Sequence, residues 1–257
     1  MSHAQGTPIW YELMTRDPQA AQRFYEAVVG WRFGEPPPPG SAMDYRMIGA
    51  PDGLVGGVFT LTAEMCTQGA RPAWVMYLGV NDVDASVASA TAAGAQLQVP
   101  AFDIPDVGRI AMLADPQGAP FYLMRGASDA ESTACAPDRP GHGAWHELHA
   151  SDGPAATAFY TSQFGWGLGT AMDMGPDGVY QLITVGGQDL AGVMTVTGGG
   201  RPAWLIYFRV DGIDRAAERI VAAGGQVVVG PMEVPGGGWI VNGIDPEGAM
   251  FGLTGTR

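Results

Sequence analysis

Apolar and polar positions alternate in short blocks along the first half of the chain, and each block has the length of a single strand or helix. Residues 10–15 predict a strand. Asp17 followed by Pro18 predicts a helix start, because Asp accepts hydrogen bonds from free backbone amides and Pro is tolerated in the first turn. Apolar residues then recur on one helical face until Gly30, which ends the helix. Strands are expected near residues 45–49 and 54–61.

The same order of elements then restarts. Residues 74–80 predict a strand, and residues 82–93 predict a helix that Gly94 ends. Further strands are expected near residues 96–100, 109–114 and 119–124. The repeating module is therefore one strand, one helix and two or three strands, and it occurs twice in this half of the chain.

The second half of the chain repeats the first. The motif WYEL at residues 10–13 returns as WHEL at residues 145–148, which is 135 positions later (145 minus 10). The motif RPAW at residues 71–74 returns at residues 201–204, 130 positions later (201 minus 71). So many matches at nearly one offset indicate a tandem duplication. We expect one domain over residues 1–127, a solvated linker over 128–141 and a second domain over 142–257, with four modules in all.

The composition excludes several classes of function. Of 257 residues, 46% are hydrophobic and 15% charged, which is typical of a globular protein. All 13 basic residues are Arg, which excludes a Schiff-base lysine and a P-loop lysine. The 26 acidic residues bring the net charge to −13, so we expect neither a nucleic-acid partner nor a membrane partner.

The cysteines and the N-terminal residues indicate the compartment. Cys66 and Cys135 are too few for a cysteine-rich zinc site or a disulfide framework. The chain has no basic flank followed by an apolar run near its start, and no apolar run long enough to span a membrane. We therefore expect a cytoplasmic protein with free thiols.

The chain resembles the vicinal oxygen chelate superfamily, which includes glyoxalase I, bleomycin-resistance proteins and extradiol dioxygenases. The resemblance lies in LMTRD at residues 13–17, FY at 24–25 and GW at 30–31. The closing turns DPQG at residues 115–118 and DPEG at 245–248 match as well. The resemblance implies an α+β fold of four βαβββ modules. They would pair into two glyoxalase-like domains whose mixed sheets form cups, with ligands on the concave faces.

The resemblance also implies positions for a metal site. Metal-binding members place His, Gln or Glu on the first strand of a module and Glu on its last. The corresponding positions here hold Trp10, Trp145, Val75, Leu205, Tyr122, Gly252, Gly57 and Gly192. None of these side chains is the imidazole, thiolate or carboxylate that a divalent metal prefers. We therefore expect no metal and no other cofactor, which argues against glyoxalase I and extradiol dioxygenase activity.

Strand alternation predicts which side chains face each cup. The faces are mostly aromatic and apolar, as in a pocket for a small molecule. The predicted ligand-binding residues are Trp10, Tyr77, Tyr122, Trp145, Tyr207 and Arg209.

Glu12 and Glu147 are the candidates for chemistry, because a carboxylate among aromatic rings suits a general base or acid. The alternative is structural: each Glu would bind a Trp indole N–H or a backbone amide, and its presence in both copies fits a shared structural role.

Two polar residues occur in the second copy alone. His149 corresponds to Met14, and Arg209 corresponds to Gly79. They are candidates for moving a proton or for binding a carboxylate or phenolate ligand. The alternative for Arg209 is an internal ion pair with a glutamate. His146 is expected on the face opposite His149, because successive strand residues alternate.

Three functions remain open. The first is metal-free binding of a small aromatic or hydrophobic molecule, as in drug-sequestering relatives. The second is a metal-independent enzyme, a lyase, isomerase or hydroxylase-like protein, in which Glu12, Glu147 or His149 moves a proton. The third is a metal-dependent glyoxalase or dioxygenase. We expect a small-molecule partner and a monomer, itself an internal pseudo-dimer, or a weak homodimer.

Overall fold

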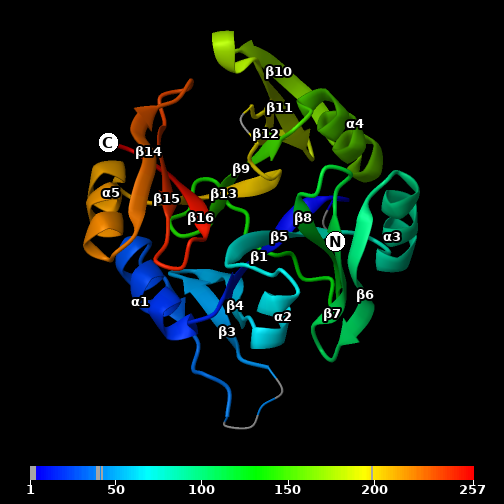
Figure 1. Cartoon of the computed structure of the whole chain (residues 1–257), viewed down its shortest axis with the longest axis horizontal. Helices are drawn as coiled ribbons and strands as arrows, with labels where there is room; N and C mark the ends of the chain where they lie inside the picture. Colours follow the sequence, from blue (N-terminus) through cyan, green and yellow to red (C-terminus); the bar gives the residue numbers. More distant parts are fainter. Residues whose placement is uncertain (1–3, 39–40, 42, 198) are drawn as a thin grey trace. The chain divides into compact units, whose positions relative to one another are not determined.

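Four modules of one strand, one helix and three strands follow one another along the chain in the computed structural model (Figure 1), which describes residues 4–38, 41, 43–197 and 199–257. The first copy contains β1 (Thr7–Thr15), α1 (Pro18–Val28), β2 (Arg32–Phe33), β3 (Tyr45–Ala50), β4 (Gly53–Thr60), α2 (Ala63–Thr67), β5 (Ala73–Gly79), α3 (Val83–Ala92), β6 (Gln96–Ile104), β7 (Gly108–Ala114) and β8 (Pro120–Gly126). The short elements β2 and α2 were not predicted from the sequence.

The second copy repeats this order without a counterpart of α2. It contains β9 (Gly143–Ala150), α4 (Gly153–Phe164), β10 (Gly167–Asp173), a 3₁₀ turn (Gly175–Asp177), β11 (Val179–Val185), β12 (Gln188–Thr195), β13 (Ala203–Arg209), α5 (Ile213–Ala222), β14 (Gln226–Glu233), β15 (Trp239–Ile244) and β16 (Met250–Gly255). The predicted α+β class and the four βαβββ modules are confirmed.

The strands form two eight-stranded mixed sheets, one for each copy. The first copy contributes the half-sheets β2-β3-β4-β1 and β5-β8-β7-β6, and the second contributes β10-β11-β12-β9 and β13-β16-β15-β14. In every half-sheet whose register is resolved, the first strand of the module runs parallel to its last strand, as β1 does to β4 and β13 to β16. The helix supplies the crossover that a parallel pair requires.

The compact units of the chain combine modules from different copies. The first unit consists of the segment up to Ile9, Met76–Ser132 and Trp145–Leu205; the second consists of Trp10–Val75, Thr133–Ala144 and Ile206–Arg257. Each unit therefore holds one module of each copy. In Figure 1, α3 lies beside α4 in the first unit, and α1 lies beside α5 in the second.

An aromatic cluster forms the core of each unit. In the second unit, Phe208 packs against Trp31 and Trp74, with ring centroids 4.7 and 4.9 Å away. In the first unit, Tyr160 stacks on Trp166 at 5.3 Å. Trp31 and Trp166 are buried where each helix leads into a strand. Burial of such large rings dominates the stabilisation of a core.

A buried tyrosine links the two modules within each unit. Tyr25 accepts a hydrogen bond from the indole of Trp74 at 2.8 Å and donates to Asp245 in the last module at 3.2 Å. Burial, and then the nearby Asp245 carboxylate, raise the pKa of Tyr25 well above its usual value, so the phenol keeps its proton. Tyr160 makes the same bridge between Trp204 and Asp115 in the first unit.

The closing turns also bind the other module of their unit. The carboxylate of Glu247 accepts hydrogen bonds from the Thr15 hydroxyl and from the backbone amides of Arg16 and Asp17, at 2.7 and 3.0 Å. Its equivalent, Gln117, accepts from the amide of Asp152 at 2.8 Å in the first unit. Each turn thus satisfies the free backbone donors that precede a helix of the other copy.

Part of the expected linker is anchored in the second unit. The stretch from residue 127 to 133 is mostly exposed, but Ala134 is buried and His142 is fully buried. The two ring nitrogens of His142 face oxygen acceptors at 2.6 Å, the carbonyl of Thr133 and the carboxylate of Asp52. The segment is therefore held by specific hydrogen bonds instead of being solvated throughout.

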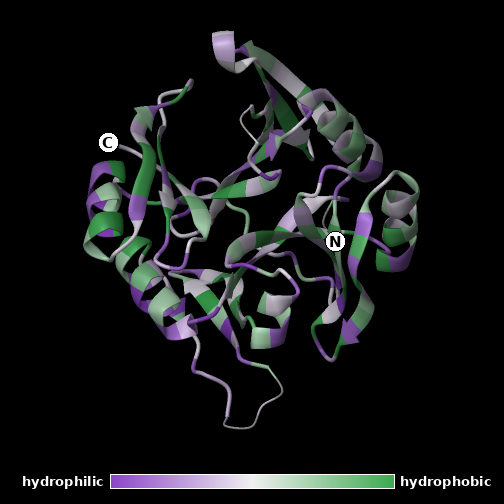
Figure 2. Ribbon diagram, in the orientation of Figure 1, coloured by the Kyte–Doolittle hydropathy of each residue, from purple (hydrophilic) through white to green (hydrophobic). Residues whose placement is uncertain are grey.

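The hydropathy of the helices matches their burial, with apolar residues on the buried face. Figure 2 shows α5 with alternating hydrophilic and hydrophobic bands, and its buried residues are Ile213, Ala216 and Ile220. Such spacing buries one face of a helix. In the described part of the chain, no helix is both long enough and apolar enough to cross a membrane.

Candidate functional site

A tryptophan and a tyrosine form a hydrogen-bonded pair on the first module of each copy. The indole Nε1 of Trp10 donates to the Tyr45 hydroxyl at 2.8 Å, and that of Trp145 donates to the Tyr180 hydroxyl at 2.8 Å. All four side chains are half-buried. The hydrogen bond satisfies the polar tip of each indole, so the rings can offer apolar surface to a ligand.

Glycine on the strand between each pair makes this arrangement possible. Gly57 is in register with Glu12, and Gly192 with Glu147. A β-carbon on Gly57 would overlap the ring of Tyr45, and one on Gly192 would overlap the ring of Tyr180. The tyrosine rings thus cover two of the positions that the resemblance assigns to metal ligands.

The other ligand positions carry no better donors. Tyr122 stacks on Tyr77 with centroids 4.2 Å apart, and the ring of Tyr207 covers Gly252. Val75 and Leu205 are buried apolar residues. In the described part of the chain, no group of three His, Cys, Asp or Glu side chains could hold a metal ion. The residues at these positions do not fit a divalent metal, because they offer neither imidazole, thiolate nor carboxylate.

Glu147 is the centre of a hydrogen-bonded chain in the first unit. The Tyr180 hydroxyl donates to its Oε2 at 2.9 Å, and the Nε2 of His149 lies 2.6 Å from its Oε1. The chain runs from Trp145 through Tyr180 and Glu147 to His149 (Trp145→Tyr180 2.8 Å). The side chain of His149 keeps 25% of its surface exposed, against 13% for Glu147. His149 is therefore the more accessible end.

The first copy keeps the pair but lacks the imidazole. Glu12 is only 3% exposed, and Met14 stands where the second copy has His149. A thioether neither accepts nor donates a proton near neutral pH. Of the three candidates for proton transfer, the structure therefore joins Glu147 to His149 and leaves Glu12 in a half-site with no imidazole.

His146 and Arg209, the other polar residues considered in the sequence, have different surroundings from those of His149. Nδ1 of His146 donates to the Leu190 carbonyl at 2.9 Å, and burial lowers the pKa of this imidazole to about 4. It does not share the surroundings of His149, as alternation predicted. Within the described residues, the Arg209 guanidinium has no ion pair or hydrogen bond, so the expected alternative of an internal pair with a glutamate is wrong.

The sequence reasoning missed Tyr45 and Tyr180. The duplication itself could have revealed them, because they are 135 positions apart (180 minus 45), the same offset as Trp10 and Trp145. It also missed Asp52, which binds His142 and has no sequence motif that marks it. The hydrogen bond from His142 is the main cause that lowers the pKa of Asp52 below its usual value.

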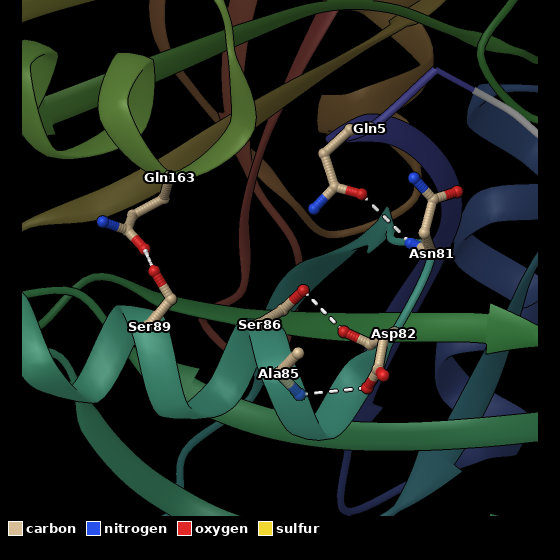
Figure 3. A pocket seen from close by; sticks show the side chains of 7 residues that line it. All are labelled: Gln5, Asn81, Asp82, Ala85, Ser86, Ser89 and Gln163. Carbon is tan, nitrogen blue, oxygen red and sulfur yellow. Dashed lines mark hydrogen bonds between the residues drawn. The ribbon is translucent and has the colours of Figure 1, made fainter.

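A separate polar hollow of about 330 Å³ lies on the helix side of the first unit. It is lined by Gln5, Asn81, Asp82, Ala85, Ser86, Ser89 and Gln163 (Figure 3). These residues bind each other: Ser89 donates to Gln163 at 2.7 Å, and Asp82 caps α3 through the amide of Ala85 at 3.0 Å. None of the candidate residues lines this hollow.

Family models match both copies. Residues 10–124 match the glyoxalase-like domain, and residues 142–253 match the glyoxalase/bleomycin resistance protein/dioxygenase superfamily. The chain belongs to this superfamily. The resemblance noted in the sequence is thereby confirmed, and the two matches follow the two copies of the repeat.

Curated relatives of this superfamily member span nearly the same length. It is 33% identical to "Putative glyoxylase CFP32" of Mycobacterium bovis, over 98% of the chain and 95% of the relative. It is 31% identical to "Anthracycline biosynthesis protein DnrV" of Streptomyces peucetius, over 85% of the chain and 82% of the relative.

Solved structures show the same fold at lower identity. The 2,3-dioxygenase LapB from Pseudomonas sp. KL28 has a TM-score of 0.68 at 12% identity, with 99% of this chain and 93% of that chain covered. The Mn(II)-bound glyoxalase from Novosphingobium aromaticivorans has a TM-score of 0.66 at 18% identity, with 99% and 82% covered. At these identities the likeness concerns the fold alone.

Proposed function

We propose that this member of the superfamily binds a small aromatic or hydrophobic molecule without a metal ion. The observation that carries the proposal is the Trp–Tyr pair of each copy, which covers Gly57 and Gly192 with a tyrosine ring. Each Trp–Tyr pair offers flat apolar surface at positions where a metal-dependent relative would need side chains that coordinate the metal. Pockets for small molecules are lined in this way, with few polar groups.

The proposal is supported by the hydrogen bonds that the tryptophan indole N–H groups already make within the protein. The Trp10 indole N–H is bound by Tyr45, so a ligand that covers these rings need not supply a partner for it. Stacking on such rings contributes about 0.5–1.5 kcal/mol beyond the burial of area. The similarity to a protein named for anthracycline biosynthesis makes polycyclic aromatic molecules a rational first set of probes.

Titration calorimetry with a dihydroxyanthraquinone and with 1-naphthamide tests the proposal. We expect saturable binding, and we expect Trp10→Ala or Trp145→Ala to weaken it about tenfold, because each removes one ring of a pair. Trp239→Ala is the matched control, since this indole is covered by Arg257, whose guanidinium carbon lies 4.4 Å from the ring centroid. The proposal would be contradicted if neither probe binds, or if all three variants weaken binding equally.

Proton transfer by Glu147 and His149 is a second candidate function. It is favoured by the 2.6 Å contact between Nε2 of His149 and Oε1 of Glu147, because a carboxylate that orients an imidazole is a recurrent acid–base arrangement. The substrate would meet His149, the more exposed of the two side chains. The carboxylate would hold the ring in place.

Substitution of Glu147 separates a chemical from a structural role. If the pair transfers a proton, Glu147→Gln should lower the turnover of an active substrate about 10²-fold with little change in stability. If the carboxylate only holds the strands, the variant should lose roughly 1–3 kcal/mol in chemical denaturation, because a neutral amide replaces the carboxylate that contacts Tyr180 and His149. Glu12→Gln is the internal control, since its half-site has no imidazole.

A further inference from the structure

Arg209 lies at the end of β13, on a face that alternation defines. Phe208 is in the aromatic core, so its neighbours Tyr207 and Arg209 lie on the opposite face of the strand. On the adjacent strand β16, Gly252 is in register with Tyr207, and Thr254 is in register with Arg209. A cation and a hydroxyl therefore stand side by side, next to the tyrosine ring that covers Gly252.

The first copy has an apolar arrangement at the same place. Its residues in the positions of Arg209 and Thr254 are Gly79 and Met124. The backbones correspond, because Gly79 accepts a hydrogen bond from Gly6 at 2.8 Å, as Arg209 does from Gly141 at 2.7 Å. Two adjacent positions thus carry polar side chains in the second copy and none in the first.

The neighbouring residue on the first strand of the copy also differs between the two copies. A β-carbon at Gly79 would lie 3.0 Å from a methyl group of Ile9. The residue that corresponds to Ile9 in the second copy is Ala144. The first copy thus has a large apolar side chain next to glycine, and the second has a small one at the position next to arginine, which leaves room for the long stem of Arg209.

The charge of Arg209 is not compensated within the described part of the chain. Arginines with a carboxylate partner there are Arg16, Arg46, Arg109, Arg125, Arg139 and Arg257. Arg209 is half-buried and has no such partner, although the chain holds 26 acidic residues against 13 arginines. A partly desolvated guanidinium without a counter-ion is a strong site for an anion.

We propose that Arg209 and Thr254 bind the anionic group, a carboxylate or phenolate, of an aromatic ligand in the second unit. The inference rests on the proposed binding function and narrows its ligand class. The guanidinium offers parallel N–H donors that match a carboxylate, and the hydroxyl of Thr254 adds a donor beside them. The equivalent positions Gly79 and Met124 lie in the first unit and provide neither, so the two units differ in the charge of the ligand they accept.

Calorimetry with 1-naphthoate and its neutral amide, 1-naphthamide, tests the inference. We expect Arg209→Met to weaken naphthoate about tenfold or more and to change naphthamide by less than about twofold, because a hydrogen bond to a charged group is lost only for the anion. Thr254→Val should weaken naphthoate about fivefold. Arg209→Lys keeps the charge and loses the planar fork, so naphthoate affinity should be intermediate.

Arg23→Met is the matched control, because Arg23 is an exposed arginine on α1 of the same unit and its loss changes the net charge equally. An equal loss in Arg23→Met and Arg209→Met would overturn the inference, since it would reflect net charge alone. Binding of both probes that Arg209→Met leaves unchanged would also overturn it, while the proposed function would stand. If neither probe binds the unmodified protein, this inference fails, whereas the proposed function fails only if the dihydroxyanthraquinone does not bind either.

Discussion

The first strands of the two copies share a tryptophan and a glutamate but differ in the residue that follows two positions after the glutamate. On β1 and on β9, a tryptophan donates to a tyrosine that lies over a glycine, at 2.8 Å in both cases. Two residues after the glutamate, β1 has Met14 and β9 has His149. The closely packed Trp–Tyr–Gly arrangement is the same in both copies, whereas the position that differs holds a buried Met14 in the first and a partly exposed His149 in the second. Duplication has therefore kept the scaffold and varied the chemistry.

The closing turns give a second comparison of the same kind. Glu247 accepts hydrogen bonds from the Thr15 hydroxyl and from two backbone amides, and its Oε1 lies 3.1 Å from Nε of Arg16. Gln117 occupies the equivalent turn and both accepts from and donates to Asp152. The third residue is a carboxylate in one turn and an amide in the other, although both turns hold a module of the other copy in the same unit. The two units should therefore respond differently to acid.

Substitution of the glycines under the tyrosine rings should have the largest effect. Gly57→Ala and Gly192→Ala should each lower the free energy of unfolding by roughly 1–3 kcal/mol, because the new β-carbon forces the ring away. Denaturant titration followed by tryptophan fluorescence measures this loss. Gly200→Ala is the control, because a β-carbon there would meet no atom within 4 Å. Gly69 is also surrounded by open space, but its φ of +106° would strain an alanine. A loss in one copy only would show that the Trp–Tyr pairs are not equivalent.

Glu247→Gln should lower stability at pH 7 by about 1–2 kcal/mol, because charge-assisted hydrogen bonds become neutral ones. Desolvation raises the pKa of Glu247, but the hydrogen bonds from Thr15, Asp17 and Arg16 outweigh it and hold the pKa below its usual 4.5. The stabilisation is thus present above pH 4.5 and is lost as pH falls through the lowered value.

Urea titrations of the native protein and Glu247→Gln, from pH 7 down to pH 3, check this. The difference between the two should shrink below pH 4.5. Gln117→Ala is the comparison in the first unit, and its destabilisation should not vary with pH, since an amide does not titrate. A Glu247→Gln effect that stays constant over this range would contradict the role of the charge.

His149→Met, which converts the second copy to the residue of the first, should change stability by less than about 1 kcal/mol, because the contact between His149 and Glu147 is partly exposed. The reverse change, Met14→His, should cause an equally small loss of stability if Glu12 accepts a hydrogen bond from the new imidazole, and a larger loss if it does not. Thermal unfolding of both variants measures this. A loss from His149→Met as large as that from Gly192→Ala would show that His149 is a structural residue.

The smallest effect concerns metals. Zinc, nickel or ferrous iron should not raise the melting temperature, and the purified protein should contain less than about one tenth of a metal ion per chain. Elemental analysis and thermal unfolding with added metal measure this. Stoichiometric metal whose binding is abolished by Glu147→Gln or His149→Met would show that the second copy has gained a site outside the positions of the superfamily.

The order of elements and the four modules followed from the sequence, because strand and helix periods and the caps at Asp17 and Gly30 are local properties. The separate faces of His146 and His149 followed from the same alternation. Local patterns did not reveal β2 or α2, since a strand of two residues and a helix of five are too short to have a period.

The tertiary structure alone decided what each side chain meets. The grouping of modules from different copies depends on contacts between residues about 220 positions apart, such as Tyr25 and Asp245. No sequence pattern shows that Glu147 has Tyr180 on one oxygen and His149 on the other, or that Arg209 has no carboxylate partner among the described residues. Period and composition fix which face a residue lies on, but its partners depend on the packing of distant segments, and those partners determine its chemistry.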